Sequence, residues 1–211
     1  MFVTLPQFSR EIPPDQVGEV IETSTTGFLA QCLEPQEISF PKMPPFGSWV
    51  KSIDEESQNQ IYAIVYHGTT TPIDTVHRAR ALGLSIPELK EQQPQIFAML
   101  KTEFKAVIIG FQSADESGTI FQYIPPRPPQ IHQSVSECRS IEIINFSEKL
   151  DFLRTLLLVG EVPVESLIAA VIRQIYHLRK FDRQWLVKAG RELNLILRDD
   201  YDRLRVILSQ I

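Results

Sequence analysis

Histidine and cysteine, which commonly carry catalysis or bind metals, are few in this chain and widely spaced. The four histidines are His67, His77, His132 and His177. Two imidazoles bind one metal ion when they stand four residues apart on a helix or in an H-E-x-x-H pattern. No two histidines here have that spacing, so we interpret each as a surface or capping residue.

The two cysteines, Cys32 and Cys138, belong to no C-x-x-C pair. Such isolated cysteines are typical of buried thiols in a reducing compartment. A disulfide between them is the alternative. The G-x-S-x-G pattern, which would indicate a nucleophilic serine, does not occur.

Phosphate-binding motifs are absent from the sequence. Neither G-x-x-x-x-G-K-[ST] nor G-x-G-x-x-G after a strand occurs, so the clustered backbone amides that hold a nucleotide are not provided. We therefore expect no cofactor and no bound metal, and we expect that the protein is not an enzyme. An enzyme with an active site assembled from distant residues remains an alternative.

Two clusters of charge have a structural and a functional interpretation. Asp199, Asp200 and Asp202 could bind a divalent ion, but acids at a helix start usually cap backbone amides, and we favour capping. The only basic concentration is interleaved with acids. It comprises Arg173, Arg179, Lys180, Arg183, Lys188 and Arg191. A solvated surface with local ion pairs is favoured over a site for nucleic acid or an acidic partner.

The overall charge argues against a general polyanion binder. The formal net charge is -5, and residues 1–140 carry 10 Lys and Arg against 16 Asp and Glu. Proteins that contact many phosphates usually have a basic surplus.

The segment from Val17 to Thr71 is predicted to form the strands that would position any functional site. Its runs rich in Val, Ile, Phe and Thr end at turn-forming residues, a pattern typical of short antiparallel strands. The runs are Gly18–Thr23, Gly27–Leu33, Ser48–Ser52 and Ile61–His67. They predict a small antiparallel β-barrel, preceded by an extended lead-in over residues 1–16.

An added helix and a β-hairpin are expected after the barrel core. Residues 75–84 are either a last barrel strand or a connector. A helix is predicted from Ile86, with a restart at Pro94, because proline suits a first helical turn. Residues 104–112 and 120–124 are predicted to pair as the hairpin.

The C-terminal part is predicted to be an antiparallel helical bundle. The run Pro125–Pro129, with four prolines in five residues, is typical of a semi-rigid spacer. Helix starts are expected at Ser147, Pro163, Asp182 and Asp199 or Asp200, and the first helix is expected to end at Gly160. The fold class is thus α+β, with a barrel domain at residues 1–124, a proline-rich linker at 125–144 and the bundle at 145–211.

The barrel segment resembles a known family, the HAS barrel. The matching positions are Gly18, Val20, Ile21, Ser24, Thr25, Thr26, Phe28, Pro45, Gly47, Val50 and Ile61–Tyr66. This barrel is shared by HerA-type DNA-translocating ATPases and the amino-terminal part of F-type ATP synthase subunits. The chain is similar to stand-alone HAS-barrel proteins of cyanobacteria, which lack the ATPase domain.

The resemblance implies a protein that binds other proteins, because in those families the barrel is a collar through which subunits meet. We expect an adaptor, assembly or regulatory subunit of a larger complex. An accessory factor of DNA processing, which binds DNA or a nuclease or ATPase partner, is the alternative. The residues proposed as exposed partner-binding anchors are Phe46, Trp49, Arg127, Arg179, Lys180 and Arg183.

The first residues, MFVTLPQFSREIPP, contain one acid and three prolines and lack a continuous apolar region. We therefore expect neither a secretory signal nor a membrane span, and a cytoplasmic location.

Overall fold

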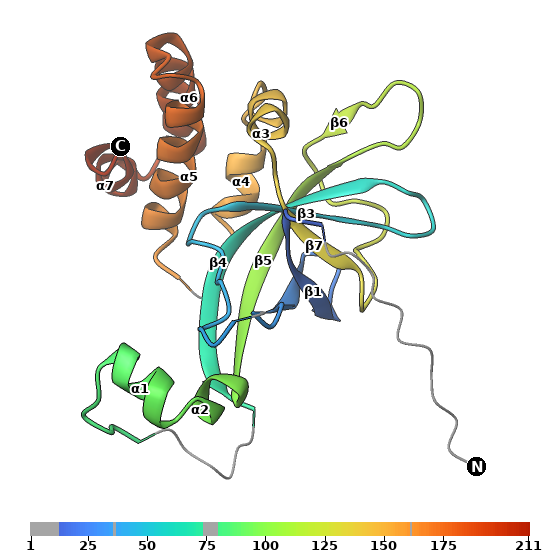
Figure 1. Ribbon diagram of the computed structural model, residues 1–211. Coiled ribbons are helices and arrows are strands. Elements are labelled where there is room, and N and C mark those ends of the chain that lie inside the picture. Colours follow the sequence, from blue (N-terminus) through green and yellow to red (C-terminus); the bar gives the residue numbers. More distant parts are fainter. Residues whose placement is uncertain (1–12, 36, 74–79, 161) are drawn as a thin grey trace.

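The computed structural model describes residues 13–35, 37–73, 80–160 and 162–211. Within those ranges the chain forms strands first, with two short helices between the fourth and the fifth, and then a series of helices (Figure 1). The strands are β1 (Gln16–Thr23), β2 (Gly27–Cys32), β3 (Trp49–Ile53), β4 (Gln60–Pro72), β5 (Leu100–Gln112), β6 (Ile120–Phe121) and β7 (Ser134–Glu137). The helices are α1 (Ile86–Gln92), α2 (Gln95–Ala98), α3 (Ser140–Phe146), α4 (Phe152–Leu156), α5 (Val164–Leu178), α6 (Arg183–Ile196) and α7 (Tyr201–Ser209).

Six of these strands close into an antiparallel barrel. The strand order is β2-β1-β7-β3-β4-β5-β6, and β2 also pairs with β5, which joins the two ends of the sheet. The short strand β6 is left as an addition on β5. Closure removes the open edges on which other strands could add. The predicted barrel and the α+β class are therefore confirmed.

The first part of the long strand β4 is apolar at every position from Ile61 to Val65. Ile61, Ala63 and Val65 pack inside the barrel, whereas Tyr62 and Ile64 point outward into a second cluster with the helices. Successive side chains of a strand point to opposite faces. Because both faces of β4 are covered, both sets must be apolar.

The C-terminal helices share a hydrophobic core with the barrel. Trp49, Val107 and Ile109 on the outer face of the barrel belong to the same buried cluster as Leu167 and Ile172 of α5. Helices follow the barrel, as predicted, but they bury their apolar faces against the barrel as well as against one another. Barrel and helices are expected to unfold together for this reason.

Strand β7 lies within the predicted linker. Its residues pair with β1 at Gln16 and Ser136 and with β3 at Lys51 and Ser136, so it closes the barrel. The sequence SVSE has one apolar residue, Val135, which is fully buried. Such a short, polar strand leaves too little pattern to predict. The segment 125–144 therefore supplies a barrel strand and the start of α3 in addition to a proline-rich stretch.

The predicted helix starts are mostly correct. The Asp182 carboxylate accepts hydrogen bonds from the backbone amides of Gln184 and Trp185, and Asp200 accepts one from Arg203. Helix α5 begins directly after Pro163. Ser147, in contrast, is the C-cap of α3, and α4 ends at Leu156, before Gly160. The prediction of one helix from Ser147 to Gly160 is wrong, because only Phe152–Leu156 of that segment is helical. The Gln122 side chain binds the carbonyl oxygens of Phe146 and Lys149 and the amide of Phe152, backbone groups that a continuous helix would pair internally.

The long strands β4 and β5 extend past the barrel and carry α1 and α2 at their tip (Figure 1). Ser85 and Glu88 form a capping box at the start of α1, and α2 follows Pro94, as predicted. The predicted hairpin is also confirmed, with only two residues of β6 paired to β5. Most of the predicted lead-in, and residues 75–79 of the strand-or-connector segment, lie outside the described residues.

Gly110 is expected to tolerate no side chain. A Cβ at this position would collide with the carbonyl oxygen of Phe121 and lie 2.9 Å from the ring of Phe146. We expect Gly110→Ala to lower the free energy of unfolding by about 1–3 kcal/mol, measured by urea denaturation. Gly160→Ala is the control, because nothing lies within 4 Å of its Cβ position. Equal stability of the two variants would contradict the packing described for β5 and β6.

Candidate interaction surfaces

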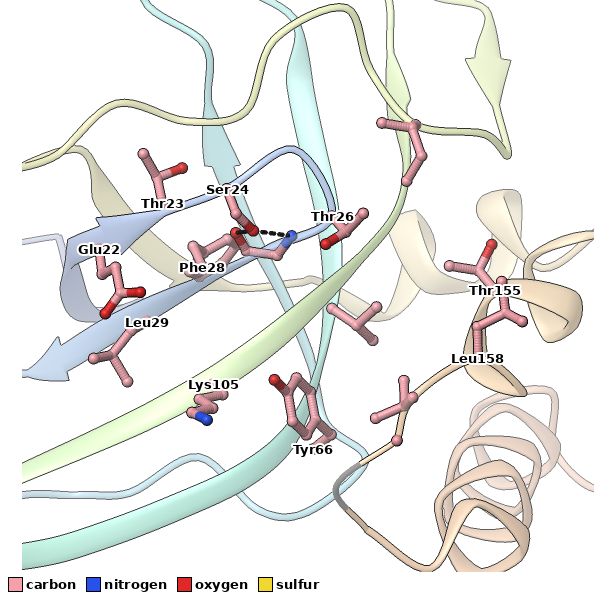
Figure 2. Close-up of a pocket in the computed structure, with 15 residues that line it drawn as sticks. Glu22, Thr23, Ser24, Thr26, Phe28, Leu29, Tyr66, Lys105, Thr155 and Leu158 are labelled. Atoms are coloured by element: carbon pink, nitrogen blue, oxygen red, sulfur yellow. Dashed lines mark hydrogen bonds between the residues drawn. The ribbon is translucent and has the colours of Figure 1, made fainter.

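A groove of 510 Å³ lies where the barrel meets the segment after α4 (Figure 2). One side is the β1–β2 turn with the start of β2, the floor comes from β4 and β5, and the other side follows α4. The lining residues are Glu22, Thr23, Ser24, Thr26, Gly27, Phe28, Leu29, Tyr66, Lys105, Val107, Ile124, Thr155, Leu158, Val159 and Gly160. We call this the barrel groove.

The β1–β2 turn forms a fixed wall of the barrel groove. The backbone amide and the hydroxyl of Ser24 both donate to the carbonyl oxygen of Gly27 at 2.9 Å. The Gly27 amide in turn donates to the Ser24 hydroxyl at 3.2 Å. A Cβ on Gly27 would lie 2.6 Å from the carbonyl oxygen of Ala106, so a glycine allows β2 to approach β5 here. The turn therefore holds Thr26 in place at the mouth of the groove.

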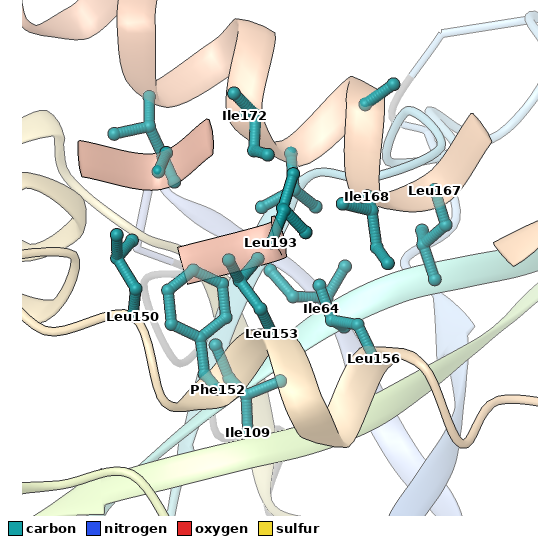
Figure 3. Close-up of a cluster of buried hydrophobic side chains, with 14 of the residues drawn as sticks. Ile64, Ile109, Leu150, Phe152, Leu153, Leu156, Leu167, Ile168, Ile172 and Leu193 are labelled. Carbon is teal, nitrogen blue, oxygen red and sulfur yellow. The ribbon is translucent and has the colours of Figure 1, made fainter. Parts of the chain in front are cut away.

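Helix α4 places an exposed leucine on the opposite wall. Phe152, Leu153 and Leu156 of α4 are fully buried beside Ile64 and Ile109 of the barrel (Figure 3). This anchorage fixes the residues that follow α4.

Leu158, two residues after the helix, is 84% exposed, although the exposure of a leucine side chain to water is unfavourable. The groove thus offers apolar surface together with the hydroxyls of Thr26 and Thr155. Such a surface suits the apolar side chains of another protein.

A buried carboxylate ties the barrel to α3. Lys51 of β3 donates to both carboxylate oxygens of Glu142, at 2.8 and 3.0 Å, and the backbone amide of Arg139 donates at 2.7 Å. Burial by itself would raise the pKa of Glu142, but the hydrogen bonds from Arg139 and Lys51 outweigh it and lower the pKa to about 2. Glu142 is therefore ionised at neutral pH and committed to its two cations.

Trp49 is not an exposed anchor, so that expectation is wrong. Its side chain is 1% exposed, and its ring centroid lies 5.4 Å from those of Phe146 and Phe152. The reason is the position of Trp49 on the barrel face that the helices cover. The sequence around Trp49 does not show this burial, because the residues that cover the ring come about a hundred positions later.

Arg179 is also used inside the molecule. Its guanidinium donates to the carbonyl oxygen of Ile144, to the Ser147 hydroxyl and to Glu148, and lies 5.3 Å from the centre of the Trp185 ring. Only 11% of its side chain is exposed. The expectation that Arg179 is an exposed anchor is therefore wrong, because the segment from α3 to α4 and Trp185 of α6 surround its guanidinium.

Arg127 stabilises the proline-rich stretch against the barrel. It forms ion pairs with Asp54 at 3.5 Å and with Glu56. Burial would raise the pKa of Asp54, but hydrogen bonds from Ser57 and Gln130 and the charge of Arg127 lower it below its usual value. Half of the Arg127 side chain stays exposed, so a second contact is still open to it.

The other three predicted anchors are exposed but do not form one site. Phe46 precedes Gly47, whose Cβ position faces Ala170 in the middle of α5. Lys180 and Arg183 instead flank the turn between α5 and α6. The barrel groove was missed because its Leu158 reads in the sequence as part of a buried helical stripe, and only the early end of α4 leaves it in solvent.

The thiols and the remaining acids offer little chemistry. Both cysteines are free; Cys32 is buried, as predicted, whereas Cys138 is partly exposed. Burial raises the pKa of Cys32 to about 11 and that of Cys138 well above its usual range, so both stay protonated at neutral pH. Within the described ranges, no three His, Cys, Asp or Glu side chains are grouped to hold a metal ion. None of the described helices combines the length and the apolar character that a membrane span requires.

Comparison with known proteins identifies the barrel. The family model described as HAS barrel domain matches residues 17–118, which include β2 to β5 and all but the first residue of β1. No curated protein matches the chain. Strand β7 and helices α3 to α7 lie beyond the matched range. Residues 17–118 of this chain are therefore a HAS barrel domain.

Proposed function

We propose that the protein is a non-catalytic subunit that binds another protein and serves the assembly or regulation of a larger complex. The barrel groove is the proposed contact surface. The observation that carries this proposal is Leu158, which stands 84% exposed on the wall of a 510 Å³ groove on the HAS barrel, beside the apolar residues Ile124 and Val159. Apolar side chains grouped at a groove commonly mark a protein contact.

The state of the reactive groups supports a role without catalysis. The two thiols are poor nucleophiles because burial raises their pKa values. The buried carboxylate Glu142 is already paired with Lys51 and Arg139. These groups stabilise the fold in their present contacts.

A role as a DNA-processing accessory is the less favoured alternative. It was based partly on a basic surface formed by Arg179, Lys180 and Arg183. Since Arg179 is occupied by the Glu148 carboxylate, the Ile144 carbonyl oxygen and the Ser147 hydroxyl, only the other two remain for phosphate contacts. Binding to duplex DNA that falls steeply with salt and is lost in a Lys180→Ala/Arg183→Ala variant would favour this alternative.

Leu158→Glu is expected to abolish binding of the partner without unfolding the protein. A carboxylate in an apolar interface must be desolvated without a counter-charge, and this should weaken a complex at least tenfold. Unfolding stability should change by less than about 0.5 kcal/mol, because the side chain is exposed. The measurement is affinity purification from native extract followed by quantitative mass spectrometry.

Leu82→Glu is the matched control for this experiment. Leu82 is also exposed and lies before α1, away from the barrel groove. We expect proteins recovered in stoichiometric amounts with the wild type and with Leu82→Glu, and their loss with Leu158→Glu. Equal recovery with all three proteins would rule out the barrel groove as the contact surface.

A further inference from the structure

A second groove lies between α6 and α7, at the outer edge of the helical layer (Figure 1). Its lining residues are Val187, Gly190, Arg191, Asn194, Leu195 and Leu208. The opposite face of α6, with Trp185, Ala189 and Leu193, is buried in the core. We call the outward surface the α6–α7 groove.

The apolar residues of the α6–α7 groove are exposed at helical spacing. Val187 and Leu195 stand eight residues apart on α6 and are 53% and 65% exposed, and Leu208 of α7 is 48% exposed. Residues separated by about two turns lie along one side of a helix. The groove therefore presents a stripe of apolar side chains to solvent.

Gly190 is an unusual residue for the middle of a 14-residue helix. Glycine makes a helix less stable than alanine does at the same position. Nothing in the described part of the chain lies within 4 Å of a Cβ placed on Gly190, so internal packing does not account for it. A glycine at the floor of a groove allows another backbone to approach closely.

The one charged side chain that lines the α6–α7 groove is basic. Arg191 lines it, and Arg183, exposed two turns earlier, lies on the same side of α6. Neither arginine forms an ion pair with any residue that the structure describes. The one acid of α6, Glu192, faces Arg154 at 3.8 Å instead. The positive charge beside the groove is therefore available to a partner.

We propose that the α6–α7 groove binds an amphipathic, acidic helix of a partner protein. Apolar side chains spaced by one turn of such a helix cover Val187, Leu195 and Leu208, and flanking carboxylates pair with Arg183 and Arg191. A nucleic acid would satisfy the arginines but leave the leucines in water. The proposal is independent of the barrel groove, and Leu158→Glu leaves this binding unchanged.

The test uses the full chain and a synthetic peptide of about 16 residues with leucines at one-turn spacing and glutamates on both flanks. Binding is followed by fluorescence anisotropy of the labelled peptide. We expect a micromolar Kd, and at least about tenfold weaker binding of the same peptide with lysines in place of the glutamates. No binding of the acidic peptide at about 1 mM, or equal binding of the two peptides, would overturn the proposal.

Gly190→Ala gives a prediction in which stability and binding change in opposite directions. We expect the melting temperature to rise by a few degrees, because alanine favours the helix and meets no obstacle. We expect peptide binding to weaken by about tenfold, because the methyl group fills the floor of the groove. If stability rises and peptide binding does not change, the peptide does not approach the backbone at Gly190. That result would overturn the α6–α7 groove as the proposed binding site.

Two pairs of variants separate the apolar from the charged contribution. Leu195→Ala is expected to weaken binding of the acidic peptide about tenfold. Leu158→Ala, the same change at another exposed leucine, is expected to leave the Kd of the peptide unchanged. Arg191→Glu is expected to abolish binding of the acidic peptide and to improve that of the lysine peptide, and Arg80→Glu changes neither.

The proposal is wrong if light scattering shows a dimer that Leu195→Ala dissociates, because a second copy then fills the groove. It is also wrong if duplex DNA competes for the groove with the acidic peptide and loses its affinity in Arg191→Glu.

Discussion

Trp49→Ala is expected to lower the free energy of unfolding by about 3–5 kcal/mol. The indole is 1% exposed and contacts Phe146 of α3 and Phe152 of α4, edge to face. Its removal leaves a cavity at the buried interface between barrel and helices, because the surrounding residues are held in place by both elements. The loss is a large fraction of the stability of an ordinary domain.

The Trp49 variant also tests whether the two parts form one unit. We expect a single unfolding transition, shifted to lower denaturant, in both far-UV circular dichroism and the fluorescence of Trp185. Phe46→Ala is the control, since Phe46 lies three residues earlier and is 44% exposed. A Trp49 variant as stable as this control, or helices that melt separately from the barrel, would contradict the shared core.

Glu142→Gln is expected to lower the free energy of unfolding by about 3 kcal/mol at neutral pH. The substitution removes the negative charge that faces Lys51 and Arg139 and leaves the Lys51 ammonium, whose side chain is 16% exposed, without its counter-ion. Lys51→Met/Glu142→Gln should recover most of the loss, because neither buried charge then remains unpaired. Urea denaturation of the three variants measures these differences.

The effect of Glu142→Gln should fade in acid. The pKa of Glu142 is lowered from 4.5 to about 2 in the folded protein, so its ionised form stabilises the fold fully above about pH 4.5. That contribution is lost as the pH falls toward 2, because the folded protein then takes up the proton as well. The difference in the free energy of unfolding between wild type and Glu142→Gln is therefore expected to shrink over this window. Glu116→Gln, a change in an exposed loop, is the control and should leave the stability at neutral pH unchanged. A difference that does not depend on pH would contradict the ion pair.

The sequence predicts strands and helix starts well where the signal is local. The run Ile61–Tyr66 is apolar throughout, and Asp182 and Asp200 stand where helices begin, because a cap needs only the next two or three amides. Strand β7 carries one apolar residue and is a strand only because β1 and β3 leave a gap between them. No local pattern could have shown it.

The candidate sites were harder to predict for the same reason. Whether Trp49 is exposed depends on α3 and α4, which lie about a hundred residues later in the sequence. The exposure of Arg179 depends on Ile144, Ser147 and Glu148, which come more than thirty residues earlier. Both side chains prove to be largely buried. Leu158 presents the opposite case, since its apolar neighbours predict burial and the early end of α4 leaves it exposed. Exposure is a property of the tertiary structure and is not encoded in the residues on either side.

Site-specific photo-cross-linking at position 158 tests the proposed function most directly. A photoreactive amino acid replaces Leu158 in the full chain, and the same residue placed at position 80 is the control. We predict one cross-linked product of defined mass, containing a partner protein, from position 158 and none from position 80. Identical products from both positions, or only uncross-linked protein from position 158, would contradict the claim that the groove on the HAS barrel is a protein-binding surface.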